Sequence, residues 1–162
     1  MSTLQPYLLT FTTYGTFLAG DPRGATRRGT REQFPDSPAL RATIRASLRE
    51  APLALRREQR LAVHRAITCA ALVSGWERVA LTVEPAHVHA VVALDAPPHR
   101  AAAALKAFAT AALRRQGLDD GRDRFWTTGS GVRALRSYSA IESAVRYVEA
   151  HPHAAEWCAP AA

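Results

Sequence analysis

The chain has 162 residues, with 21 lysine and arginine residues against 14 aspartate and glutamate residues, and its formal net charge is +7. This length favours one domain, and a hydrophobic content of 48% supplies a core, which excludes a wholly disordered chain. Two cysteines are too few for a disulfide scaffold, and no stretch approaches the roughly 20 apolar residues of a membrane span. The positive charge makes a polyanion the leading partner class.

The first half of the chain predicts one strand, a polar loop and two helices. Residues 7–14 (YLLTFTTY) are dense in aromatic and β-branched side chains, which is typical of a strand. Residues 20–33 are rich in glycine and arginine and predict a basic loop or arm. Apolar residues recur at steps of four over 38–50 and keep to one side over 55–74, so both segments are expected to be helices.

The second half predicts two strands, a helix, a further strand and a last helix. Residues 76–83 alternate, and 87–94 (HVHAVVAL) form a near-continuous apolar run that suits a central strand. Residues 98–116 are alanine-rich with apolar residues in helical register, and 124–135 are expected to form a strand or hairpin. A capping-box pattern at 139–142 predicts a last helix that ends near Pro152.

This order of elements predicts an α+β fold, best described as a ferredoxin-like sandwich. An antiparallel sheet of four to five strands would carry helices packed on it. The whole of 1–162 is expected to form a single domain that contains the basic loop 20–33, since no internal repeat or low-complexity linker divides it. The N-terminus lacks the basic start of a signal peptide, so the expected compartment is the cytoplasm.

Two histidines, His87 and His89, open the predicted central strand. Residues i and i+2 of a strand share a face, so both imidazoles are expected to point the same way. Two neighbouring neutral imidazoles can chelate one divalent metal. The alternative is a pair of partly buried histidines with no ligand.

Tyr147 and His151 are four residues apart in the last predicted helix, which makes them neighbours on one face. By itself such a tyrosine is an amphipathic residue at the margin of a core. Together with His87 and His89, these side chains are the parts of a metal-assisted phosphodiester transfer, in which the metal polarises the phosphate and the phenol attacks phosphorus. A free phenol has a pKa of about 10, so the nucleophile would need a nearby cation or base.

Residues 84–92 (EPAHVHAVV) resemble the HUH motif, His-hydrophobic-His, of the single-tyrosine transposases. The resemblance is strongest to the REP-associated tyrosine transposase branch of the IS200-like superfamily. Residues 14–24, 125–129 and 147–152 resemble further segments of these proteins in the same order, so the resemblance covers roughly 7–153. It implies one HUH transposase-like domain over the chain.

In that family the motif histidines bind Mg²⁺ or Mn²⁺, and the helix tyrosine attacks single-stranded DNA, leaving a 5′-phosphotyrosine and a free 3′-hydroxyl. Carried over by motif position, His87 and His89 become metal ligands and Tyr147 becomes the nucleophile. The family commonly has Gln or Asn four residues after the tyrosine, the former a third ligand in some members. This chain has His151, whose imidazole can still ligate but shifts the expected preference toward Mn²⁺ or Zn²⁺. Ala86 replaces the usual Asn or Asp and removes a hydrogen-bond partner for a histidine.

The resemblance implies single-stranded or hairpin DNA as the partner, bound by a monomer or homodimer with no membrane contact. Basic side chains would meet backbone phosphates, and an exposed aromatic ring would stack on a base. Each arginine taken singly also fits a solvated surface charge. The candidate DNA-binding residues are Arg23, Arg27, Arg28, Arg31, Lys106, Arg133, Arg136 and Trp126.

These residues together predict a metal-dependent single-stranded DNA endonuclease and strand transferase acting at hairpin or palindromic DNA, in a bacterial cytoplasm at the nucleoid. One alternative is a non-catalytic, domesticated nucleic-acid-binding domain. Another is a metal hydrolase that activates water without a covalent tyrosine. His64 and His99 are expected to be structural or solvent-facing, and Glu84 to be a solvated carboxylate at a strand end, with a spare metal ligand as its alternative.

Overall fold

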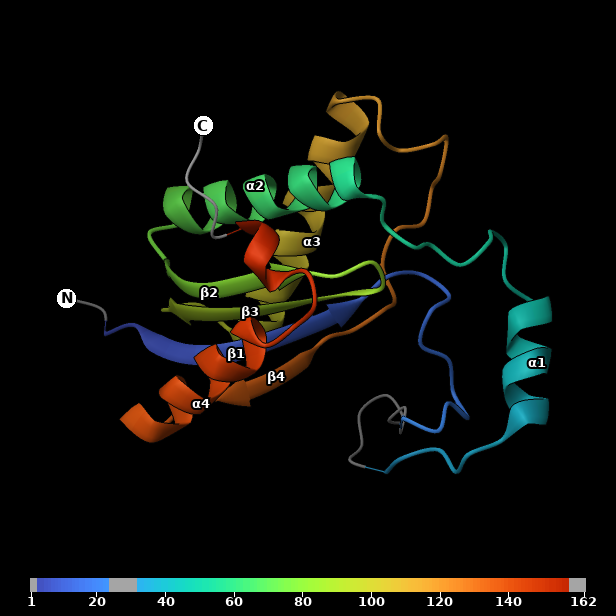
Figure 1. Cartoon of the computed structure of the whole chain (residues 1–162), viewed down its shortest axis with the longest axis horizontal. Helices are drawn as coiled ribbons and strands as arrows, with labels where there is room; N and C mark the ends of the chain where they lie inside the picture. Colours follow the sequence, from blue (N-terminus) through green and yellow to red (C-terminus); the bar gives the residue numbers. More distant parts are fainter. Residues whose placement is uncertain (1–2, 24–31, 158–162) are drawn as a thin grey trace.

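A computed structural model describes residues 3–23 and 32–157, and its centre is one antiparallel sheet. The strands are β1 (Gln5–Thr12), β2 (Glu77–Val83), β3 (His87–Leu94) and β4 (Gly131–Ala134). Their order across the sheet is β2-β3-β1-β4, and each neighbouring pair is antiparallel (Figure 1). This order places β1 and β3 in the centre, where the sequence predicted a buried strand.

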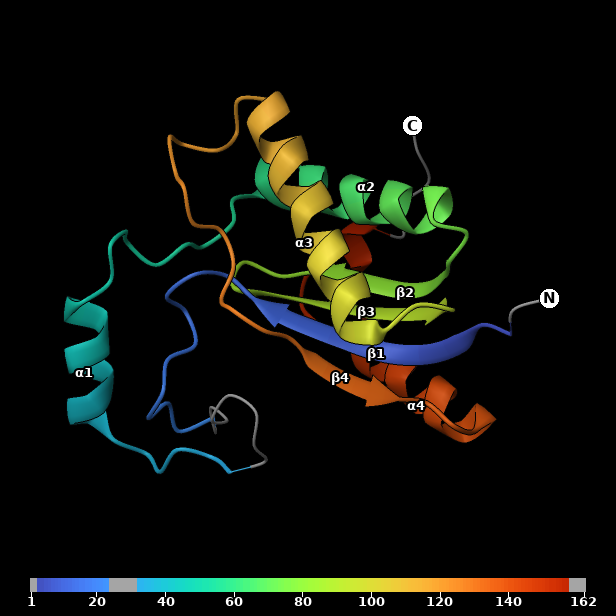
Figure 2. The ribbon, with the colours of Figure 1, turned by 180° about the vertical axis from the view of Figure 1, so that it is seen from behind.

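Helices cover both faces of this sheet. On one face lie α2 (Arg57–Val73) and α3 (Pro98–Arg115), and the view from behind shows α3 crossing the strands (Figure 2). On the other face lies α4 (Tyr138–Glu149), packed over β2 and β3 and followed by the short 3-10 turn η1 (Ala154–Trp157). The α+β sandwich with a four-stranded antiparallel sheet is therefore confirmed.

A further helix, α1 (Pro38–Ala46), stands apart from the sheet in both views of the ribbon. It lies wholly within the described part of the chain and has no buried residue. Ser37 caps its start, since its side chain accepts a hydrogen bond from the backbone N–H of Leu40. Helix α1 itself therefore contributes nothing to the core, whereas Leu53 and Leu55, which follow it, are buried in the large cluster.

The alternation of side chains along β1 and β3 builds two cores of unequal size. Leu9 and Phe11 of β1, with Val88 of β3, belong to the large cluster under α2 and α3. Leu8 and Val91 belong to the small cluster under α4. Because successive strand residues point to opposite faces, the positions that do not feed the large core lie on the side of α4.

Several predicted bounds are wrong, each for a local reason. The first strand ends at Thr12, and Gly15 then turns the chain with a φ of 76°, where a Cβ would come 3.0 Å from Pro52 Cα. The stretch 124–135 supplies only the four residues of β4 and a single bridge between Thr13 and Trp126. The last helix ends at Glu149, close to Pro152 as predicted, because helical backbone is disfavoured at the residue before a proline.

Two further observations complete the fold. Residues 24–31 of the predicted basic loop lie outside the described residues. Among the described residues, no helix combines the length and the apolar character that crossing a bilayer requires.

Candidate active site

The pairing of β1 with β3 brings hydroxyl side chains beside the two motif histidines. Thr10 lies opposite His89 and Thr12 lies opposite His87, all on the face that carries α4. Thr10 Oγ1 and His89 Nδ1 share a hydrogen bond of 2.8 Å, which fixes the plane of the imidazole. The sheet therefore presents both rings on one face, as the His-x-His spacing predicted.

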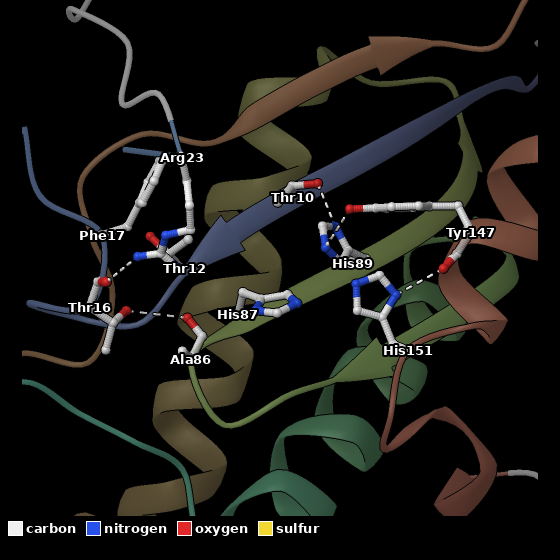
Figure 3. A pocket seen from close by; sticks show the side chains of 10 residues that line it. All are labelled: Thr10, Thr12, Thr16, Phe17, Arg23, Ala86, His87, His89, Tyr147 and His151. Carbon is white, nitrogen blue, oxygen red and sulfur yellow. Dashed lines mark hydrogen bonds between the residues drawn. The ribbon is translucent and has the colours of Figure 1, made fainter. Parts of the chain in front are cut away.

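Helix α4 carries Tyr147 over this face, and the turn that follows the helix carries His151. Tyr147 Oη lies 3.4 Å from His89 Nε2. His151 Nδ1 donates to the backbone oxygen of Tyr147 at 2.9 Å, which leaves Nε2 of His151 as the nitrogen with a free lone pair. Figure 3 shows both side chains pointing toward the two strand histidines.

The three imidazoles form a compact cluster. Their ring centroids are 4.7 Å apart for His87 and His89, 4.6 Å for His89 and His151, and 5.3 Å for His87 and His151. One ligand nitrogen from each ring lies within 4.8 Å of the other two. Three imidazole nitrogens gathered in this way are a donor set that could hold a divalent transition metal.

The electrostatics of the cluster keep its strand histidines neutral. Burial, and after it the positive charge that His87 and His151 would carry, lowers the pKa of His89 to about 3. Burial also lowers the pKa of His87, with a smaller effect from His151. Neutral imidazole is the form that binds metals, so both rings are ready to ligate at neutral pH.

The cluster lies at one end of a cavity of about 310 Å³ whose other lining residues are Thr10, Thr12, Thr16, Phe17, Arg23 and Ala86. Arg23, Phe17 and Thr16 occupy the end away from Tyr147 and His151 (Figure 3). Arg23 donates to both carboxylate oxygens of Asp21, at 2.8 and 2.6 Å, and to Thr16 O at 2.9 Å. Its guanidinium lies 4.9 Å from the centre of the Phe17 ring, so the charge has a fixed position in the cavity.

Comparison with known proteins finds structures with a similar fold. No family model matches the sequence, and no curated protein matches it. The structure is similar to that of a REP-associated tyrosine transposase bound to a REP hairpin, with a TM-score of 0.55 and 15% identity, covering 96% of this chain and 70% of that one. This chain has the fold of that transposase. The expected resemblance is thus confirmed at the level of the fold.

A second similar structure is that of a protein from Deinococcus radiodurans R1 described as a candidate transposase. It has a TM-score of 0.46 and 16% identity, and the match covers 90% of this chain and 89% of that one.

The predicted DNA-binding residues are spread over the transposase-like fold. Arg23 lines the cavity. Arg133 is exposed on β4, opposite Leu8, so it lies on the same sheet face as the histidines, and Arg136 is exposed just after that strand. Arg27, Arg28 and Arg31 lie outside the described residues.

Two other predicted contacts are tied into the fold. Lys106 of α3 donates to the backbone oxygens of Thr127 and Gly129, and burial lowers its pKa. Trp126 Nε1 donates to Thr110 Oγ1 at 3.0 Å, and its ring packs edge-on against Phe11. Both side chains thus have structural partners on the α3 side of the sheet, and their DNA contacts stay predictions.

The expectation of a solvated Glu84 is wrong. Its side chain is buried, accepting hydrogen bonds from Thr82 Oγ1 and from His153, which lies 69 residues along the chain. The short pattern around the strand end carries no signal for this burial, because the partner comes from the segment after α4. The cavity threonines were also missed, although Thr10 and Thr12 alternate in the predicted first strand as His87 and His89 do.

Proposed function

We propose that the protein is a metal-dependent single-stranded DNA endonuclease and strand transferase that cuts hairpin or palindromic DNA through Tyr147. The observation that carries this proposal is the 3.4 Å between Tyr147 Oη and His89 Nε2, which joins a phenol to three imidazoles within one chain. The fold shared with a transposase solved on a DNA hairpin supports this class of substrate.

His87, His89 and His151 would hold the metal ion. When bound, the ion supplies Lewis acidity at the scissile phosphate. A donor set made of three imidazoles suits Mn²⁺ or Zn²⁺ better than Mg²⁺, which prefers oxygen ligands and bound water. We therefore expect Mn²⁺ to support a higher rate than Mg²⁺.

Tyr147 supplies the nucleophile. Its Oη attacks phosphorus, a P–O bond to tyrosine forms, and the bond from phosphorus to the 3′-oxygen breaks. The Tyr147 side chain is accessible to water, since the residue is 49% exposed, so a water molecule would accept the phenol proton, and the departing oxygen takes up a proton to become a 3′-hydroxyl. A 3′-hydroxyl that attacks the phosphotyrosine rejoins the strand and frees the enzyme. Because one chain holds both groups, a monomer is sufficient for this chemistry.

Basic side chains in and near the cavity would bind the phosphates of the DNA backbone. Arg23, fixed by Asp21, would bind a phosphate next to the scissile one, and Arg133 and Arg136 would meet the backbone where it passes β4. A DNA substrate places this work in the bacterial cytoplasm at the nucleoid.

Covalent adduct formation tests the proposal. A hairpin oligonucleotide with a single-stranded flank is incubated with Mn²⁺ and resolved on a denaturing gel. A 3′ label should stay with the protein, and a 5′ label should leave on a fragment that ends in a 3′-hydroxyl. Tyr147→Phe should form no adduct, whereas Tyr138→Phe, in the same helix and 81% exposed, should react as the wild type does. An undiminished adduct in Tyr147→Phe would remove the nucleophile from the proposal.

The same experiment identifies the alternatives. Hairpin binding without metal, and no cleavage with Mg²⁺, Mn²⁺ or Zn²⁺, would indicate a non-catalytic binding domain. Cleavage that survives Tyr147→Phe but is lost in His87→Ala would indicate a metal hydrolase that uses water.

A further inference from the structure

The turn between β2 and β3 contains a buried carboxylate. Glu84 is 3% exposed. Its Oε1 accepts from Thr82 Oγ1 at 2.8 Å and from the backbone N–H of His153 at 3.2 Å, and its Oε2 accepts from His153 Nδ1 at 2.6 Å. We call Thr82, Glu84 and His153 the clasp. A buried carboxylate is costly unless its oxygens are hydrogen-bonded, and these three bonds satisfy both of them.

The clasp is connected to the first strand histidine through the backbone of Glu84. The backbone N–H of Glu84 donates to His87 O at 2.8 Å and closes the turn that begins β3. The carboxylate is therefore fixed relative to the two strand histidines. It belongs to the same rigid sheet that carries them.

The other side of the clasp leads to the third histidine. His151 lies two residues before His153, and the backbone N–H of Ala154 donates to His151 O at 3.0 Å. The far end of this segment is also anchored, because Arg60 of α2 donates to both carboxylate oxygens of Glu156 at 3.0 Å. The turn that carries His151 is thus held at His153 and again at Glu156.

His151 lies beyond the last residue of α4, and two hydrogen bonds tie it to that helix: its backbone N–H donates to Val148 O at 3.3 Å and its Nδ1 donates to Tyr147 O at 2.9 Å. Helix α4 ends at Glu149, and Pro152 prevents its continuation through His151. The two buried residues of α4 are Ala144 and Val148, which offer a small apolar contact. The position of the turn after α4 therefore depends on the polar contacts of His153 and Glu156, together with the stacking of Trp157 on His64.

We propose that Glu84 is a positioning residue, which holds the turn of His151 against the β2–β3 turn through His153 so that the three imidazoles converge on one divalent ion. This inference rests on the metal site of the proposed function. Glu84 acts through His151 and supplies no ligand itself. Removal of a hydrogen-bonding partner that orients metal ligands typically weakens metal affinity by roughly 10- to 100-fold.

The test is Mn²⁺ affinity of the full chain, measured by titration calorimetry without DNA. Glu84→Ala should weaken the affinity by roughly 10-fold or more. Glu84→Gln keeps an accepting oxygen but turns an amide N–H₂ toward a donor, so its loss should be smaller. His153→Ala removes the 2.6 Å bond from the other side and should resemble Glu84→Ala.

A double-mutant cycle separates positioning from general stability. In a His151→Ala background, adding Glu84→Ala should not weaken Mn²⁺ binding further, since the residue it positions is gone. The matched control is Gln59→Ala, which removes another buried polar link, to Leu118 O and Asp120, on the α2 side of the sheet. This control should lower the melting temperature and leave Mn²⁺ affinity unchanged.

The outcomes distinguish the clasp from the proposed function. Wild-type affinity in Glu84→Ala, or an equal loss with and without His151, would overturn the positioning role. If Glu84→Ala does not fold, Glu84→Gln and His153→Ala carry the same test. Wild-type protein that binds Mn²⁺ but forms no adduct would overturn the nuclease proposal and leave the clasp, whereas wild-type protein that binds no ion would overturn both.

Discussion

The two faces of the sheet use the same strands for different purposes. Under α2 and α3, the strands contribute to a large, continuous apolar cluster. Under α4, a small apolar cluster borders a cavity that carries histidines, threonines and a tyrosine. Strand β3 feeds both, with Val88 on one side and His87 and His89 on the other. The difference shows that one face can supply the stability that lets the other keep polar groups in fixed positions.

The largest expected effect is a loss of metal binding, without a loss of stability, when a histidine on the α4 face is replaced. His87→Ala should weaken Mn²⁺ binding by about 100-fold or more and abolish the DNA adduct, because it removes a donor nitrogen. The free energy of unfolding without metal should change by less than about 1 kcal/mol, since the ring lies outside the large core. Calorimetric titration, the adduct assay and urea unfolding measure these quantities.

His99→Ala is the control for this change, because His99 is exposed on α3 and bonds to Ser130. It should bind Mn²⁺ and react as the wild type does. A large loss of stability in His87→Ala would contradict the division of labour between the faces.

The converse experiment replaces an apolar residue in the core under α2 and α3. Leu105 of α3 is fully buried in the large cluster, so Leu105→Ala should lower the free energy of unfolding by about 2–5 kcal/mol. Urea unfolding measures the loss. Mn²⁺ affinity of the folded fraction should stay within about twofold, and a clear drop at a temperature where the variant is fully folded would show that the faces are coupled.

A smaller effect concerns pH on the stabilising side. His64 of α2 stacks on Trp157, and burial, with Arg78 and Arg65 nearby, lowers its pKa to about 4. The unfolded chain binds this proton below about pH 6.5 and the folded chain below about pH 4, so stability should fall as pH drops between these values. His64→Phe keeps a ring against Trp157 but binds no proton. Acidification from neutral pH to about pH 5 should therefore lower its free energy of unfolding by about 1 kcal/mol less than that of the wild type. Equal stability losses on acidification would contradict this assignment.

The smallest effect compares arginines on the two faces. Arg133 lies on the face of the cavity, so Arg133→Gln should weaken hairpin binding a few-fold and reduce the slope of log affinity against log salt by about 1. Arg65→Gln, exposed on α2, removes the same charge from the opposite side and should leave both quantities unchanged. Fluorescence anisotropy over a range of salt concentrations makes the comparison.

Much of this arrangement could be predicted from local patterns. The period of two placed His87 and His89 on one face, and the i, i+4 spacing made Tyr147 and His151 neighbours, because both rules depend on backbone geometry alone. The same rules predicted the order of strands and helices.

Long-range partners could not be predicted in this way. Glu84 is buried by His153, and Trp126 is held by Thr110, through contacts that no local period encodes. The bond between Thr10 and His89 depends on the register of two strands that lie far apart in the sequence. Residues 124–135 show little alternation, which is why the length of β4 was overestimated.

The register of β1 against β3 also determines which mutations would disrupt the fold and which would disrupt only the site. A one-codon deletion near the start of β3 would slip the strand by one position and turn both imidazoles into the large apolar core. Such an allele would lose its fold and its chemistry in one step. A missense change at His87 or Tyr147 should remove the proposed chemistry and spare the fold, so a lineage that drifts by substitution retains a stable, basic protein of the same fold. Single-codon deletions should therefore be rarer than missense changes within β3 among inactive copies that are still expressed.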